Sequence, residues 1–348
     1  MSAQAGSSAS PTVPSAPFPL PTVLPDVPVF PPRPDDQVNV DMALLELLHH
    51  YLADSFPVTF THGETREATM QYALRAPYLM FQVLAVSARH LSLVRPDQAL
   101  QYHGLAIRLQ TQALAIFDKN KADLAAETCD ASQRAPVLVF STLLGVHALC
   151  DTLSFREDDF SMTLARFIGY VKLHRGVYGV VAPYLHQIPP PEAEGLTAAG
   201  LVWHAPAGVG HECDDLLHRL DGVAATMEPA ELDAAKKAIA HLQWVFDAGF
   251  ARLGDRGFMA LSWPVTVDPS YTQLLQNGRP EALVILAYYL LLLHFLRDFW
   301  VVGDSVGETL LESLARYLGP SWSPWLETPF RLLRESGTSR NQTVGGKA

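Results

Sequence analysis

The stretch ALVILAYYLLLL, residues 282–293, is the longest apolar run in the chain. Glu281 precedes it, His294 and two further apolar residues extend it, and Arg297 closes it. A membrane-spanning helix needs about 20 consecutive apolar residues, which is more than this run supplies. The run therefore predicts a helix buried in the core of a folded domain, with a membrane-resident helix as the alternative, and we expect no membrane span.

Apolar residues recur at helical spacing along most of the chain after residue 40. Residues 135–153 are apolar enough to form a second helix that is buried on all sides, and Pro229 opens the clearest amphipathic pattern, which continues to residue 253. Pro96 opens another predicted helix, with Leu100, Ile107 and Leu114 seven residues apart on its face. The sequence thus predicts an all-α fold with one large multi-helix domain.

Composition limits the domain organisation and the partners. The chain has 348 residues, 49% of them hydrophobic, and its net charge of −11 disfavours direct contact with nucleic acid. Three cysteines, far apart, fit neither a disulfide framework nor a CxxC zinc site. We expect a disordered Pro-rich tail without a secretory signal at residues 1–40, the helical domain at residues 41–335 and a disordered tail at residues 336–348.

Acidic residues invite a comparison with metal-dependent terpene cyclases. Asp304, Glu308 and Glu312 are spaced four apart, and a looser cluster lies at residues 214–221. Ser305 and Glu308 also match a capping box, which explains Glu308 without a metal. The sequence contains no HExxH zincin motif, GxSxG motif, phosphate-binding glycine loop or dinucleotide fingerprint. It therefore predicts no catalytic residues, no metal site and no cofactor.

Five separated blocks of sequence carry a family resemblance. They are LLELLHHY at 44–51, APYLMFQVLAVSARHL at 76–91, YVKLHRGV at 170–177, RPEALVILAYY at 279–289 continuing to RDFW at 297–300 and GD at 303–304, and LGPSWSPWL at 318–326. In order and spacing, over about residues 40–330, the blocks resemble the regulatory domain of fungal binuclear-zinc-cluster transcription factors of the sterol uptake control type.

The resemblance implies a helical domain that self-associates and senses a sterol in an apolar pocket, beside an N-terminal six-cysteine zinc cluster that binds DNA. Cys129 is the first cysteine of this chain, so we expect the zinc cluster to be missing. Either a partner supplies the DNA contact or the gene model lacks an exon. The family's pocket lies among C-terminal helices, which gives these candidate ligand-binding residues: Tyr288, Tyr289, Leu292, Phe299, Trp300, Gly303, Trp322 and Trp325.

Three functions from different classes remain open. The first is a nuclear transcription regulator in secondary metabolism that senses a sterol-like or terpenoid molecule and acts as a homodimer, or as a heterodimer with a zinc-cluster protein. The second is an enzyme whose apolar pocket promotes cyclisation or isomerisation of a terpenoid or polyketide, and the third is a lipid-binding protein. The missing zinc cluster weighs against the first function and the missing catalytic set against the second. The resemblance favours the regulator, and places it in the nucleus rather than the cytoplasm.

Overall fold

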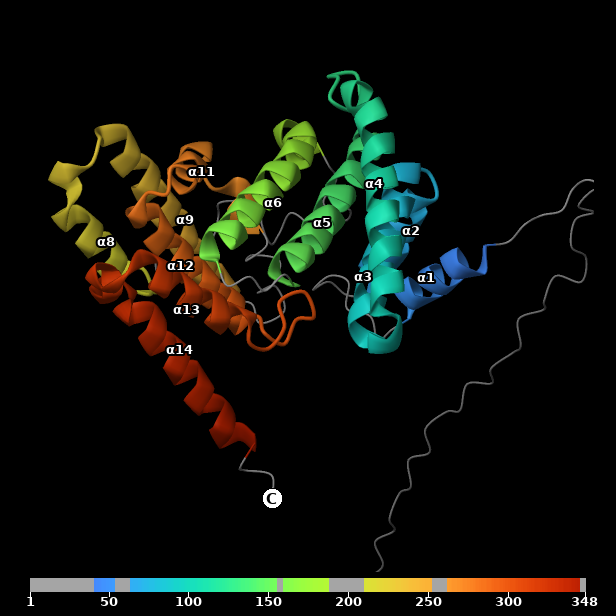
Figure 1. Ribbon diagram of the computed structural model, residues 1–348. Coiled ribbons are helices and arrows are strands. Elements are labelled where there is room, and N and C mark those ends of the chain that lie inside the picture. Colours follow the sequence, from blue (N-terminus) through green and yellow to red (C-terminus); the bar gives the residue numbers. More distant parts are fainter. Residues whose placement is uncertain (1–40, 54–62, 155–158, 188–209, 252–261, 345–348) are drawn as a thin grey trace, which may run out of the picture. The chain divides into compact units, whose positions relative to one another are not determined.

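The described part of the chain is built from helices (Figure 1). The computed structural model describes residues 41–53, 63–154, 159–187, 210–251 and 262–344, and within these ranges every regular element is an α-helix or a 3-10 helix. The predicted all-α fold is therefore confirmed. The chain divides into Met1–Asp41 and a unit from Met42 to Ala348, which holds the described helices. The predicted Pro-rich tail, residues 1–40, lies outside the described residues.

Helix α12, Pro280–Phe295, contains the long apolar run. Pro280 occupies the first turn, where the missing backbone N–H costs no helical hydrogen bond. Every residue from Ala282 to His294 is buried. The helices that contact α12 most extensively are α9 (Pro229–Ala251), α11 (Pro269–Gln276), α13 (Val306–Leu318) and α14 (Ser323–Val344). The prediction of a buried core helix is confirmed.

A second core helix, α5, comprises Ala131–Ser154 and packs against α3 (Pro77–Val94) and α6 (Phe160–Val181). It is buried on nearly all sides, as the sequence predicts for residues 135–153. Among the described helices, only the Ser132–Ser154 part of α5 is by itself long and apolar enough to cross a membrane, and 78% of its most apolar window is buried inside the fold. Helices α11 and α12 reach that length only as a pair, which is bent by 111°. Burial of this kind is typical of a core helix in a folded domain.

Helix α4, Ala99–Leu124, turns a different face to the core from the one that the seven-residue spacing predicts. Leu100 is 90% exposed and Ile107 is 45% exposed, so the predicted stripe is wrong at these positions. Small side chains alternate with large ones on the face that is buried, where α4 packs along α3, and this lets the two helices approach closely. That face carries Tyr102, Ala106, Leu109, Ala113 and Phe117.

The remaining described elements are short. They are α1 (Met42–Leu52), α2 (Gly63–Ala73), α8 (Asp214–Gly222) and the 3-10 turns η1 (Pro96–Gln98), η2 (Ala182–Gln187), η3 (Ala224–Thr226) and η4 (Pro320–Trp322). Asp159 caps α6, where its carboxylate accepts a hydrogen bond from the Ser161 backbone N–H at 2.9 Å. Helix α14 continues to Val344, past residue 336, which is the predicted start of the C-terminal tail.

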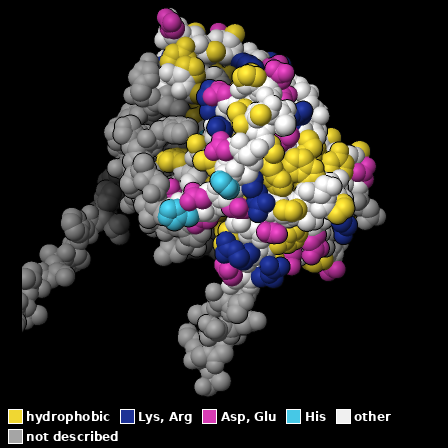
Figure 2. All heavy atoms as spheres, turned by 90° about the vertical axis from the view of Figure 1, so that its left-hand side faces the viewer, with side chains coloured by type: hydrophobic (Ala, Val, Ile, Leu, Met, Phe, Trp, Pro, Cys, Tyr) yellow, Lys and Arg dark blue, Asp and Glu magenta, His cyan; other side chains and the backbone are white. Residues whose placement is uncertain are grey.

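One face of the molecule shows how the surface charges are distributed. Acidic and basic side chains are interspersed with apolar ones over this face (Figure 2). Several of the charges on α8, α9 and α14 are paired, including Lys236 Nζ with Asp221 Oδ1 at 2.6 Å and Arg331 Nη1 with Glu335 Oε1 at 3.0 Å. Exposed pairs of this kind contribute little to stability, about 0–1 kcal/mol each.

Candidate functional site

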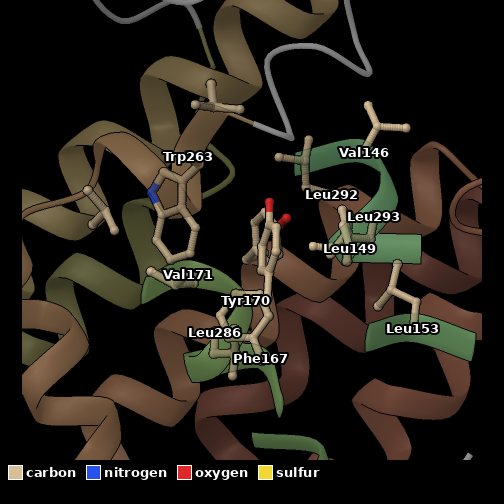
Figure 3. Close-up of a cluster of buried hydrophobic side chains, with 14 of the residues drawn as sticks. Val146, Leu149, Leu153, Phe167, Tyr170, Val171, Trp263, Leu286, Leu292 and Leu293 are labelled. Carbon is tan, nitrogen blue, oxygen red and sulfur yellow. The ribbon is translucent and has the colours of Figure 1, made fainter. Parts of the chain in front are cut away.

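An aromatic cluster lies where α6 and α12 meet the helical turn at residues 262–266. The ring of Tyr289 stacks on Trp263 with 4.9 Å between ring centroids, and it lies 5.7 Å from the ring of Phe167. Phe167 in turn lies 5.9 Å from Tyr170. Figure 3 shows Tyr170 in the middle of this region, with Trp263 to one side and Leu149, Leu292 and Leu293 to the other. Side chains from α6 and from the apolar run of α12 thus meet in one buried centre.

Two tyrosine hydroxyls in this centre have no hydrogen-bond partner among the described residues. Tyr170 is 3% exposed and Tyr289 is fully buried, and the hydroxyl oxygens of both are unpaired. Burial raises the pKa of each phenol well above its usual value, and the nearby Tyr170 raises that of Tyr289 further, so both hydroxyls stay protonated. A buried hydroxyl without a partner costs about 1–3 kcal/mol, so each one requires an explanation.

A third tyrosine in the cluster is satisfied. The Tyr271 ring lies 5.4 Å from Trp263, on the same tryptophan that Tyr289 contacts. Its hydroxyl donates to the backbone carbonyl of Ala282 at 3.0 Å. Tyr271 therefore provides an internal reference for a buried tyrosine that the fold itself has paired.

His174 lies one helical turn beyond Tyr170 on α6. The two ring centroids are 5.8 Å apart, and the imidazole lies directly over Gly145 of α5. Burial, opposed by a hydrogen bond to the Ser141 backbone and assisted by Arg175, lowers the pKa of His174 to about 3. The imidazole is therefore neutral at physiological pH, and its Nδ1 atom has no partner among the described residues.

Arg175 holds the helical turn of Trp263 in place. Its guanidinium donates to the backbone carbonyls of Pro264 at 2.9 Å, Val265 at 3.1 Å and Val267 at 2.7 Å. It also donates to the Thr272 hydroxyl at 3.1 Å. The planar fork of arginine suits several carbonyls at the end of a helix, which otherwise lack donors. Arg175 thus fixes one wall of the aromatic cluster from outside.

Seven of the eight predicted ligand-binding residues, all but Gly303, fall into four sets of contacts. Tyr289 and Leu292 lie in the aromatic cluster, whereas the neighbouring Tyr288 lies close to Cys213 and Thr328, near α8 and α14. Phe299 and Trp300 contact each other, and Trp300 meets the ring of His90 on α3 at 5.0 Å. Trp322 and Trp325 pair with 5.3 Å between their ring centroids. Their role in binding a ligand stays a prediction.

The backbone conformation at Gly303, and not the close approach of a ligand, explains the glycine at this position. Its φ is 78°, in the region that disfavours residues with a side chain. A Cβ atom built there would meet only Val306 Cγ2, at 3.9 Å, within 4 Å. Backbone conformation and not a lack of space therefore accounts for this glycine.

The acidic residues at the start of α13 are not grouped as metal ligands in the described part of the chain. Within the described ranges, no group of three or more histidine, cysteine or acidic side chains is arranged to hold a metal ion. Asp304 precedes α13, while Glu308 and Glu312 lie exposed on it. Ser305 occupies the N-cap, but its side chain makes no capping hydrogen bond, so the predicted capping box is wrong. The backbone of Ser305 is not in the extended conformation that this motif requires, since its ψ is −1°.

A polar cluster between α3, α4 and α5 was not predicted from the sequence. Buried Arg89 donates through Nε to Asp151 Oδ1 at 2.5 Å, and its other nitrogens reach Ser92 and Ser154. His103 Nε2 and His147 Nε2 approach the same carboxylate at 3.4 and 3.5 Å. Burial lowers the pKa of His147 to about 4, although Asp151 opposes this shift. The arrangement satisfies a buried arginine and joins three helices.

One region of the chain matches a known protein family, and a longer stretch is similar to a known protein. Residues 46–152, from α1 to the end of α5, match the family described as the fungal specific transcription factor domain. Over 330 residues the chain is 23% identical to a Zn(2)-C6 fungal-type transcription factor of Gibberella zeae. That match covers 88% of this chain and 64% of the relative, so the chain spans less than two thirds of the relative's length.

These matches confirm the resemblance to fungal transcription factors at the level of the domain. They do not address the sterol uptake control type or the missing zinc cluster, which stay predictions. The aromatic cluster draws its tyrosines from α6 and α12, outside residues 46–152. Its neighbour Gly145 lies inside that region.

Proposed function

We propose that this chain is a regulator of transcription of the fungal zinc-cluster kind, and that its helical domain responds to an apolar small molecule. The observation that carries the proposal is the similarity, over 88% of the chain, to a zinc-cluster transcription factor. The buried aromatic cluster supports the second part, because apolar walls with a few polar groups are typical of small-molecule sites. A sterol-like or terpenoid ligand fits that description.

We further propose that the protein acts in the nucleus, in secondary metabolism, as a homodimer or together with a zinc-cluster protein that contacts DNA. The net charge of −11 supports this division of labour, because an acidic surface disfavours contact with the phosphate backbone. A gel-shift assay with the purified chain should give no sequence-selective complex with duplex DNA. A salt-sensitive, sequence-selective shift by the chain alone would contradict it.

A reporter assay tests the regulatory function. The full chain is fused to a bacterial DNA-binding domain and expressed in a fungal cell that carries the matching operator upstream of a reporter gene. We expect reporter output to differ from that of the DNA-binding domain alone, and a fluorescent tag on the unfused chain to accumulate in the nucleus. Unchanged output from a well-expressed fusion would refute the proposal. Turnover of an apolar compound by the purified chain would favour an enzyme instead.

A further inference from the structure

Helix α4 carries a row of apolar side chains on the face that points away from the core. Leu100, Ile107 and Leu114 are seven residues apart, and the first two are 90% and 45% exposed. Helix α4 lies along α3 (Figure 1), and the side that it buries carries Tyr102 and Leu109, about half a helical turn away from this row. An exposed apolar row on one helix is typical of a surface that packs against another helix.

Two residues between these three complete the row. Gly104 and Thr111 bring its spacing to alternating steps of four and three residues, which is the spacing of a seam between two helices. The Thr111 hydroxyl donates to the Ile107 carbonyl at 2.8 Å, so it is satisfied within the helix and requires no partner. We call Leu100, Gly104, Ile107, Thr111 and Leu114 the α4 seam.

Nothing in the described part of the chain explains the glycine at position 104. Its φ is not positive, and a Cβ atom built there would meet only Arg108 Nη1, at an ordinary contact distance of 3.8 Å. Glycine inside a helix costs stability relative to alanine. A second helix that crosses the α4 seam would explain it, because the missing side chain lets the two backbones approach closely.

The two ends of the α4 seam are oppositely charged. Asp97, in η1 directly before α4, lies seven residues before Gly104, and Lys121, in the last turn of α4, lies seven residues after Leu114. Both side chains are exposed, and within the described ranges neither makes an ion pair. An acidic end and a basic end are therefore available to a partner that presents the opposite order of charges.

A second copy of α4 presents that order when it runs antiparallel. Asp97 and Lys121 are equally far from Leu109 in the sequence, and so are Gly104 and Leu114. An antiparallel pair centred at residue 109 therefore sets the aspartate of one copy opposite the lysine of the other, and the glycine opposite the leucine. A parallel pair would place like charges opposite each other at both ends, which is unfavourable.

We infer that two copies of this chain pair through the α4 seam, with the two α4 helices antiparallel about a twofold axis at the level of residue 109. This inference rests on the proposed homodimer and names its surface. In a twofold pair both copies use the same patch, so each complementary contact occurs twice. One pair of helices buries less area than a standard protein interface, so we expect a weak dimer, with a Kd of about micromolar order.

Sedimentation equilibrium of the purified full chain, over a range of concentrations, is the first arm of the test. We expect the wild type to pass from monomer to dimer, and Ile107→Lys to raise the Kd at least about tenfold, because a charge replaces an apolar side chain at the contact. Met162→Lys on α6 is the matched control, since Met162 is 49% exposed, and it should leave the Kd unchanged. A wild type that stays monomeric, or equal effects of both variants, overturns the inference.

Gly104→Ala separates the stability of the fold from self-association. In dilute solution, where the monomer prevails, it should raise the Tm by about 2 °C, because alanine favours the helix and the Cβ position is open. The same substitution should raise the Kd at least about fivefold, because its methyl group meets the partner helix. Gly169→Ala on α6 should raise the Tm likewise and leave the Kd unchanged. An unchanged Kd for Gly104→Ala overturns the crossing at the α4 seam.

Charge reversal tests the antiparallel order. Asp97→Lys and Lys121→Asp should each raise the Kd by about fivefold, and the double variant should restore it, because both ion pairs form again with the signs exchanged. A double variant that associates no better than the single ones overturns the antiparallel pairing.

The reporter assay distinguishes failure of this inference from failure of the proposed function. If the purified chain is monomeric while the fused chain changes reporter output, the regulatory function stands and the α4 seam is rejected as a dimer surface. If the seam variants behave as expected while the fused chain leaves reporter output unchanged, the dimer surface stands and the regulatory function is rejected.

Discussion

The contact between Gly145 and His174 makes a quantitative prediction. A Cβ atom built on Gly145 would lie 2.2 Å from His174 Cε1, 2.6 Å from Nδ1 and 2.7 Å from Nε2. Ordinary contact begins near 3.4 Å, so the imidazole would have to move by about 1.2 Å. The ring is only 6% exposed and is packed between α5 and α6, which leaves it little room. We therefore expect Gly145→Ala to be destabilising.

Two opposing terms set the size of the effect. Overpacking a core site by one methyl group costs about 1–3 kcal/mol, and the displacement required here indicates the upper end. Alanine in a helix interior is favoured over glycine by about 1 kcal/mol. The expected net loss in the free energy of unfolding is therefore about 2 kcal/mol. Gly169→Ala on α6 is the matched control, since nothing lies within 4 Å of its Cβ position, and it should gain about 0.5–1 kcal/mol.

Urea unfolding followed by far-ultraviolet circular dichroism measures both variants. His174→Ala provides a second check, because it removes the ring that the new methyl group meets. This substitution should cost less stability in the Gly145→Ala background than in the wild type. If Gly145→Ala stabilises the protein as much as Gly169→Ala does, or if the two substitutions are additive, the close packing of the imidazole on α5 is refuted.

Three further predictions follow from the packing and the buried charges. Gly307→Ala would place its Cβ 2.7 Å from the backbone nitrogen of His294, which cannot rotate away, so α12 and α13 must separate. We expect the free energy of unfolding to fall by about 3 kcal/mol, measured by thermal unfolding, and an unchanged Tm would contradict this contact. Arg175→Lys should cost about 1–3 kcal/mol and red-shift the tryptophan emission, because the single nitrogen of an ammonium group cannot replace the planar fork whose separate nitrogens reach three carbonyls. The red shift should vanish in a Trp263→Phe background, and its persistence there would refute the role assigned to Arg175. Burial keeps His147, His174 and His241 neutral in the folded chain, so the free energy of unfolding should fall as the pH drops from about 6.5 toward 4. Each histidine should contribute up to about 1.4 kcal/mol per pH unit, because the unfolded chain takes up a proton that the folded chain does not. Unfolding that does not depend on pH over this range would refute the prediction.

The helices are predictable from the sequence where composition alone decides burial. The run at residues 282–293 and the apolar stretch at residues 135–153 have no polar face, so each could only be a core helix. The helix α4 was predicted, but its buried face was not, because that face contains Ala106 and Ala113. Alanine carries little apolar area, and only the close approach of α3 makes those positions part of the core.

The aromatic cluster is less predictable, since its parts are far apart in the chain. Tyr289 stands out within its apolar run, but nothing local to Tyr170 shows that its hydroxyl lacks a partner. A single arginine such as Arg175 likewise forms no pattern, and its role appears only when residues 264–272 fold back on α6. Contacts between segments that lie about 100 residues apart in the sequence become visible only in the tertiary structure.

Packing and hydrogen bonding at the cluster can be perturbed separately, so effects on the stability of the fold can be distinguished from effects on the proposed response to a small molecule. Gly145→Ala alters the packing of His174 and leaves both unpaired hydroxyls in place. Tyr170→Phe and Tyr289→Phe keep the shape of the rings and delete the hydroxyls. If the response to an oxygenated ligand depends on these hydroxyls, the tyrosine variants should weaken it at full stability. The glycine variant should lower stability and still respond to the ligand whenever the protein is folded, because its hydroxyl pair is intact.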